Sequence, residues 1–198
     1  MSRASLHALY RRPGFMIRRA HQIAVSVFLE ETAELGVTST QYGILYLLER
    51  RPSIDQITVA RLLGLDRSTT GMVLKTLEEG GLVCRVVEPT DRRRRTLELS
   101  QAGRDLLNEL ATPAGRAVER LLAPFAPAER AQFLALLERL TDAFNATSRV
   151  PLLADTGADL AHEGNFSNRE SMLRRPGRSG PSKMPGKVAP PARARAKD

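Results

Sequence analysis

The sequence predicts a mainly α-helical fold with one small β-hairpin, arranged as a winged helix-turn-helix. Apolar residues recur at spacings of three and four over most of residues 15–147, which is the period of an amphipathic helix. Two helical patterns are separated by only a few residues around Gly64-Leu65, which is helix-turn-helix spacing. A β-branched segment and an alternating segment then flank a basic turn, as in a hairpin.

The first two helices are expected over residues 15–35 and 39–50. Gly36 is expected to end the first helix, because glycine readily adopts the conformation found at helix C-termini. Pro52 breaks the second helix. The apolar positions of the second helix are Tyr42, Leu45, Tyr46 and Leu48.

The helix-turn-helix is expected to begin at Asp55, a plausible N-cap for a short third helix that Gly64 ends. A fourth helix is expected from Asp66 or Arg67 to about Glu79. The residues of these two helices that are expected to face the core are Val59, Leu62, Leu63, Met72, Val73 and Leu77.

The hairpin is expected to have strands from Leu82 to Val87 and from Thr96 to Ser100. Four consecutive arginines, Arg92 to Arg95, then lie at or near its tip. Two longer helices follow, over residues 101–122 and from 127 to about 147. Their apolar surface exceeds what a lone helical hairpin can hide.

The composition changes near Arg149. Residues 148–198 hold six of the twelve prolines together with scattered Gly, Ser and Arg, and show no periodicity. We therefore expect a folded domain over residues 1–147, with the helix-turn-helix and hairpin forming a lobe at about 38–100, and a disordered basic tail over 148–198.

The bulk composition favours a polyanionic partner in a reducing compartment. The net charge is +8 and the pI is near 10.5, which suits nucleic acid. The single cysteine, Cys84, excludes an internal disulfide, and its strand context predicts a buried structural thiol rather than a redox sensor. No apolar run reaches about 18 residues and no signal peptide is evident, so we expect a cytoplasmic, nucleoid-associated protein without a membrane span.

The start of the fourth helix is the first candidate DNA contact. Arg67 is suited to guanine or to phosphate, and the short donors Ser68, Thr69 and Thr70 permit close approach to DNA. Lys75 lies about two turns further on and is suited to the DNA backbone. The alternative is that Arg67, Ser68 and Thr69 merely cap a surface helix.

The arginine run is the second candidate contact. An arginine at a hairpin tip can enter the narrow minor groove. Asp91 is placed to hold Arg93 extended, while Arg92, Arg94 and Arg95 pair with phosphates. The alternative is a solvated run of charge.

The stretches "LDRSTTGMVLKTLEEGGLV" and "DRRRRTLELSQAGR", in this order of helices, resemble the MarR family of bacterial transcriptional regulators. The wing of that family commonly has the pattern Asp-x-Arg, a strand, then Leu-(Ser/Thr)-x-x-Gly. The residues here that match it are Asp91, Arg93, Leu99, Ser100 and Gly103. The resemblance covers about residues 10–147 and leaves the basic tail outside.

The resemblance implies an intertwined homodimer in which the first, fifth and sixth helices interlock. It implies a repressor on a pseudo-palindromic site in double-stranded DNA, with half-sites about one helical turn apart. It also implies release by a small phenolic or aromatic acid that binds between the dimer helices and the DNA-binding lobe.

Cationic, polar and aromatic residues suggest where such an acid binds. "RRAHQ" also resembles the start of family members that control aromatic-acid or hydroxypyridine catabolism. Arg and His beside aromatic rings suit a planar carboxylate. The alternative is that the arginines make ion pairs and that His21 is an ordinary half-buried residue. The candidate effector residues are Phe15, Arg18, Arg19, His21, Gln22, Tyr42 and Tyr46.

An enzymatic function finds little support in the sequence. The three histidines are far apart and show no metal-ligand spacing, and no glycine-rich phosphate loop is present. We therefore expect no catalytic residue, metal or cofactor. The remaining alternative to a ligand-responsive regulator is a non-specific architectural DNA-binding protein that uses the basic tail.

Overall fold

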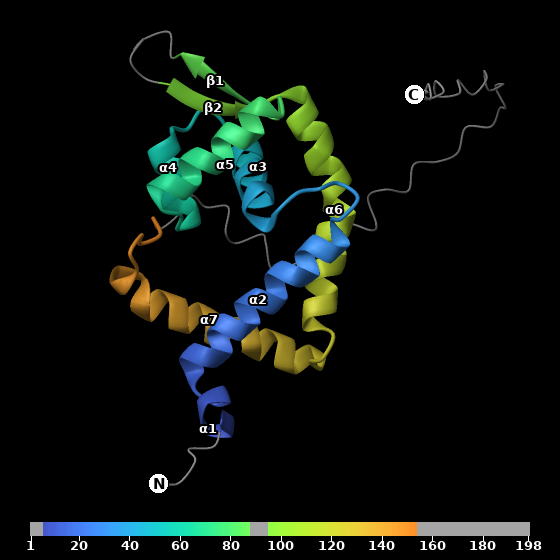
Figure 1. Cartoon of the computed structure of the whole chain (residues 1–198), viewed down its shortest axis with the longest axis vertical. Coiled ribbons are helices and arrows are strands. Elements are labelled where there is room, and N and C mark those ends of the chain that lie inside the picture. Colours follow the sequence, from blue (N-terminus) through green and yellow to red (C-terminus); the bar gives the residue numbers. More distant parts are fainter. Residues whose placement is uncertain (1–5, 88–94, 154–198) are drawn as a thin grey trace, which may run out of the picture. The chain divides into compact units, whose positions relative to one another are not determined.

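The computed structural model describes residues 6–87 and 95–153. It confirms the mainly helical fold with one hairpin (Figure 1). The elements in chain order are α1 Leu6–Tyr10, α2 Pro13–Glu31, α3 Ser39–Arg50, α4 Gln56–Leu63, α5 Arg67–Glu79, β1 Val83–Val87, β2 Arg95–Leu99, α6 Gln101–Leu122, α7 Pro127–Phe144 and the 3-10 turn η1 Asn145–Thr147.

Local capping explains where the central helices begin. Thr38 and Gln41 form a reciprocal capping box at the start of α3. Asp55 accepts from the backbone N–H of Thr58 at 2.8 Å, so its predicted role as the N-cap of α4 is confirmed. Gly64 ends α4 in the left-handed conformation, at φ 62°, which glycine adopts without steric cost.

The first long helix ends earlier than the sequence predicts. α2 stops at Glu31, and the buried Thr32 donates its hydroxyl to the carbonyl oxygens of Phe28 and Val37, at 2.8 and 3.1 Å. Its side chain thereby satisfies backbone acceptors at the end of the helix and beyond the following turn.

Three further helices differ from the prediction or qualify it. α1 was not predicted, and α7 gives way to η1 at Asn145. Pro113 lies inside α6, which continues through it.

The hairpin is antiparallel, with Val83 opposite Leu99 and Val87 opposite Arg95. The loop after α3 extends it by one bridge, Ile54 to Leu97. Leu97 and Leu99 are buried and face the helices, which fixes the wing against the helix-turn-helix.

The core lies between α3, α4, α5, the hairpin and the first half of α6. Its members are Val37, Ile44, Leu45, Leu48, Val59, Leu74, Leu77, Val83, Leu97, Leu99 and Leu110.

Two residues expected to be buried are exposed. Met72 is 66% exposed, because the buried face of α5 is formed by Thr70, Leu74 and Leu77, and Met72 points away from it. Cys84 is also exposed, so the prediction of a buried thiol is wrong. In β1 only Val83 faces the core, and Cys84 lies on the outer face opposite Glu98.

After α7 the chain returns to the helix-turn-helix (Figure 1). The side-chain amide of Asn145 makes two hydrogen bonds to the backbone of Leu152. Its oxygen accepts from the Leu152 N–H at 2.8 Å and its nitrogen donates to the Leu152 carbonyl at 3.1 Å. The Leu152 side chain lies against Gly64, and the N–H of Leu153 donates to the carbonyl of Arg61 at 3.1 Å. Beyond these residues, the predicted basic tail lies outside the described part of the chain.

Candidate nucleic-acid interface

Asp66 organises the start of α5. Its carboxylate accepts from the backbone N–H of Thr69 at 2.9 Å and from the hydroxyls of Ser68 and Thr69, both at 2.6 Å. These bonds, led by that from the Ser68 hydroxyl, hold the pKa of Asp66 well below its usual range. A carboxylate only accepts hydrogen bonds, so both hydroxyls must be the donors.

This geometry changes the role expected for Ser68 and Thr69. With their hydrogens given to Asp66, the two hydroxyls have only oxygen lone pairs left for a further partner, which they would accept from rather than donate to. The predicted contact of Thr70 with DNA is corrected by the structure. Thr70 is fully buried and donates its hydroxyl to the backbone carbonyl of Asp66 at 2.8 Å. It contributes to the core and to the first turn of α5, and does not face a ligand.

The exposed face of α5 carries the remaining predicted contacts. Arg67, Ser68 and Lys75 are exposed, and Lys75 is only loosely paired with Glu79, at 3.7 Å with both side chains in solvent. Such a pair contributes little and leaves the ammonium available to phosphate. Met72 lies on the same face, between Ser68 and Lys75. The spacing of Thr70, Leu74 and Leu77 is the feature of the sequence that indicates this position, because these residues share the buried face and Met72 lies opposite them.

The wing is described only in its two strands. Arg95 is exposed at the start of β2. Asp91, Arg92, Arg93 and Arg94 lie outside the described residues. Arg85 on β1 is not available to DNA in the same way, because its guanidinium binds Glu78 at 2.8 Å and Gln56 at 3.3 Å.

The predicted effector residues fall into two groups. In the first half of α2, the guanidinium of Arg18 lies 5.0 Å from the ring centre of Phe15 and donates to Gln22 at 3.2 Å. Arg19 and His21 are exposed on the same helix. Because His21 is exposed, the alternative that it is an ordinary half-buried residue is wrong.

The second group lies on α3. The ring of Tyr42 is 5.8 Å from that of Tyr46 and 5.5 Å from that of Phe28, at the end of α2. Phe28 was not among the predicted residues. Burial raises the pKa of Tyr42, which keeps its hydroxyl protonated. Phe15 and Phe28 are thirteen residues apart on one helix, which is roughly 20 Å, whereas Gln22 of the first group is six residues from Phe28, which is roughly 9 Å. A small molecule stacked on Phe15 therefore cannot also reach Phe28 within a single chain.

A cavity of about 470 Å³ lies beside α2 and α6. No predicted effector residue lines it, and Arg116 is the one cation among its lining residues. Such a lining disfavours an anionic acid. The acidic residues of the lining are Glu30, Glu31, Glu34 and Glu109.

Among residues 6–87 and 95–153, no group of three or more His, Cys, Asp or Glu side chains is placed to hold a metal ion. Within the same ranges, no helix combines the length and apolar character that crossing a bilayer requires.

A short helix, a tight turn, a second helix with an exposed polar face and an adjoining hairpin define a winged helix-turn-helix protein. The model of the MarR family matches residues 35–94, which include α3, α4, α5 and β1. A putative transcriptional regulatory protein for the hcr operon of Thauera aromatica is 34% identical over 128 residues, covering 64% of this chain and 77% of that protein. The chain therefore belongs to the MarR family and is a transcriptional regulator of that type, as its motifs predict.

Solved structures agree with this assignment. The PcaV regulator of Streptomyces coelicolor, solved with its natural ligand, is 35% identical, with a TM-score of 0.64 over 72% of this chain and 99% of that one. BpsR of Bordetella bronchiseptica, whose DNA binding is regulated by 6-hydroxynicotinic acid, is 26% identical, with a TM-score of 0.64 over 67% of this chain and 95% of that one.

Proposed function

We propose that this regulator is a repressor that binds a pseudo-palindromic operator as a homodimer and is released by an aromatic, phenolic or hydroxypyridine acid. The observation that carries the proposal is the exposed, Asp66-organised start of α5 within a helix-turn-helix of the MarR family. The protein acts by binding, without a catalytic step. The proposed DNA contacts are Arg67, Ser68, Thr69, Lys75 and Arg95, with Asp91, Arg92, Arg93 and Arg94 at the wing tip.

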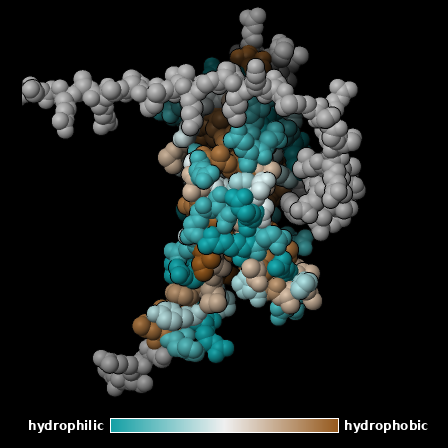
Figure 2. All heavy atoms as spheres, turned by 90° about the vertical axis from the view of Figure 1, so that its right-hand side faces the viewer, coloured by the Kyte–Doolittle hydropathy of each residue, from teal (hydrophilic) through white to brown (hydrophobic). Residues whose placement is uncertain are grey.

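The dimer is supported by apolar residues that the single chain leaves in solvent. α2 and α7 expose a series of large hydrophobic side chains, whereas the α6 side of the molecule is largely hydrophilic where it is visible (Figure 2). Exposed apolar surface of this extent favours burial against a second chain. The residues concerned are Met16, Ile17, Ile23, Leu134, Leu136, Leu137, Leu140 and Phe144.

The acid effector is supported by the Phe15, Arg18 and Gln22 group. It combines a ring, a cation and an amide within two turns of one helix, which suits the ring and carboxylate of an aromatic acid. Tyr42 and Tyr46 serve as a second aromatic surface, which Phe28 at the end of α2 extends. The acid that regulates BpsR belongs to the same chemical class.

The proposal is tested by fluorescence anisotropy with the upstream intergenic DNA of the protein's own gene and with a scrambled control. 6-Hydroxynicotinic acid and a panel of hydroxybenzoic acids are then titrated into the complex. Preference for the native DNA, reversed by one acid, is the expected result. Equal binding to both DNAs, unchanged by any acid, would instead identify a non-specific architectural protein.

A further inference from the structure

Met72 is an apolar side chain in an unusual place. The other large apolar residues of α5 are used by the fold: Leu74 and Leu77 are fully buried, and Val73 packs against the core. Met72 is 66% exposed and contributes nothing to this core. Helical geometry places the residue on the face opposite Thr70 and Leu74, and no other described element covers that face.

The neighbours of Met72 on that face are the proposed DNA contacts. Ser68 precedes it by four residues and Lys75 follows it by three, so the three side chains form one row along α5. Four residues correspond to roughly 6 Å along the helix, or about two base-pair steps of DNA. A helix that brings Ser68 to a base edge therefore brings Met72 to the bases immediately beyond.

The major groove offers one apolar group, the C5-methyl of thymine. Most other groups that a side chain meets there are hydrogen-bond donors or acceptors, for which the thioether sulfur of Met72 is at best a weak partner. A methionine is unbranched and polarizable, so it adapts to a methyl group without strict geometry. Contact would remove both apolar surfaces from water.

We propose that Met72 is a specificity-determining residue that contacts the C5-methyl group of a thymine in each operator half-site. The assignment rests on the proposed function, because it requires α5 to enter the major groove. It adds shape-based selection for thymine to the hydrogen bonding of Arg67 and Ser68. Burial of one methyl group corresponds to about a fourfold gain in affinity.

The test replaces each thymine of the bound upstream DNA, one at a time, with deoxyuridine, which pairs with adenine in the same way and lacks only the methyl group. Affinities are measured for the wild type, Met72→Ala, Met72→Leu and the control Ile57→Ala. Ile57 is 55% exposed on α4, so the control removes a comparable exposed apolar side chain from the same lobe.

At one thymine per half-site, deoxyuridine should weaken the wild type and Ile57→Ala about fourfold. The same replacement should leave Met72→Ala unaffected, and Met72→Leu should retain most of the sensitivity. The assignment is overturned if no thymine shows this coupling, or if Met72→Ala loses as much affinity as the wild type at every position. Failure of the proposed function is a different result, namely equal binding of wild type to native and scrambled DNA.

Discussion

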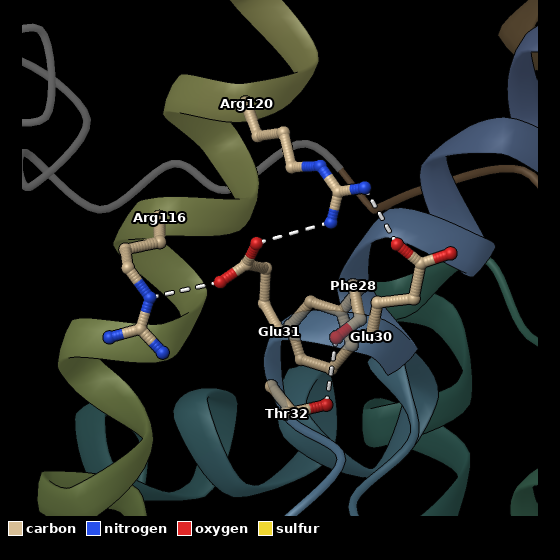
Figure 3. A network of polar contacts seen from close by, with 6 residues as sticks. All are labelled: Phe28, Glu30, Glu31, Thr32, Arg116 and Arg120. Carbon is tan, nitrogen blue, oxygen red and sulfur yellow. Dashed lines mark hydrogen bonds and ion pairs between the residues drawn. The ribbon is translucent and has the colours of Figure 1, made fainter.

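Arg116 on α6 donates from Nε to a carboxylate oxygen of Glu31 on α2, at 2.9 Å (Figure 3). The other oxygen of Glu31 accepts from Arg120 at 3.2 Å, and Arg120 also binds Glu30 at 2.7 Å. The end of α2 is therefore bound to α6 through the Glu31 side chain, which is only 18% exposed.

Glu31→Gln should make the protein less stable at neutral pH and flatten the acid side of its stability profile. The hydrogen bond from Arg116, with that from Arg120, lowers the pKa of Glu31 in the folded state from the ordinary value of 4.5. A depressed folded pKa means that the stabilisation is present above about pH 4.5 and is lost as the pH falls through the folded value. Thermal unfolding between pH 3 and pH 7 checks this, with Glu30→Gln as the control. An identical profile for wild type and Glu31→Gln would contradict it.

Gly103→Ala should be strongly destabilising. A Cβ at this buried position would overlap the carbonyl oxygen of Leu82, so the backbone must move. Such overpacking costs about 1–3 kcal/mol or more. Gly115→Ala is the matched control on the same helix, since its added Cβ meets nothing within 4 Å. The control should be neutral or stabilising by about 0.5–1 kcal/mol. Urea unfolding of both variants measures the difference, and equal midpoints would refute the steric argument.

Asp66→Ala should reduce operator binding on the order of tenfold, the scale of one base contact. The substitution removes an N-cap and also frees the hydroxyls of Ser68 and Thr69 to rotate. Asp55→Ala removes the N-cap of α4 without touching any proposed DNA contact. Both variants should unfold at lower temperature than the wild type. Only Asp66→Ala should change the preference for native over scrambled DNA in anisotropy, so a similar change in both variants would show an effect of stability alone.

Arg67→Ala and Lys75→Ala should weaken DNA binding in different ways. Loss of a base contact by Arg67 should cost about 1–3 kcal/mol on the native DNA and little on the scrambled DNA. Loss of a phosphate contact by Lys75 should weaken both DNAs alike and reduce the salt slope by about one. Binding isotherms at several salt concentrations distinguish these patterns. Uniform weakening by Arg67→Ala would place that residue on phosphate.

Asn145→Ala should loosen the turn between α4 and α5, although the two sites are about eighty residues apart in sequence. Without the two hydrogen bonds from Asn145 to Leu152, the hydrogen bond from the N–H of Leu153 to the carbonyl of Arg61 should be weakened. Amides at residues 61–65 should then exchange on the order of fivefold faster. Asn108→Ala, at an exposed position of α6, is the control. Hydrogen exchange followed by mass spectrometry decides, and unchanged exchange at 61–65 would show that the contact carries no stability.

The parts of the fold that the sequence predicted are those decided within a few residues. Asp55, Asp66 and Ser100 each accept a hydrogen bond from the backbone three residues later, so the start of their helices is encoded locally. Periodicity predicted most of the helices because it, too, depends on residues only three or four positions apart. The wing and recognition-helix motifs were sufficient to predict the family.

Burial and long-range pairing were decided by the tertiary structure. The sequence placed Met72 in the core and Cys84 in a covered strand, but exposure depends on which other element lies over a face. Likewise Glu31 finds Arg116 eighty-five residues away, and thirteen residues of one helix hold Phe15 apart from Phe28. Local sequence determines where the helices begin, because the capping hydrogen bonds join residues only three positions apart. The packing of distant segments decides which side chains are withdrawn from water and which remain free to bind.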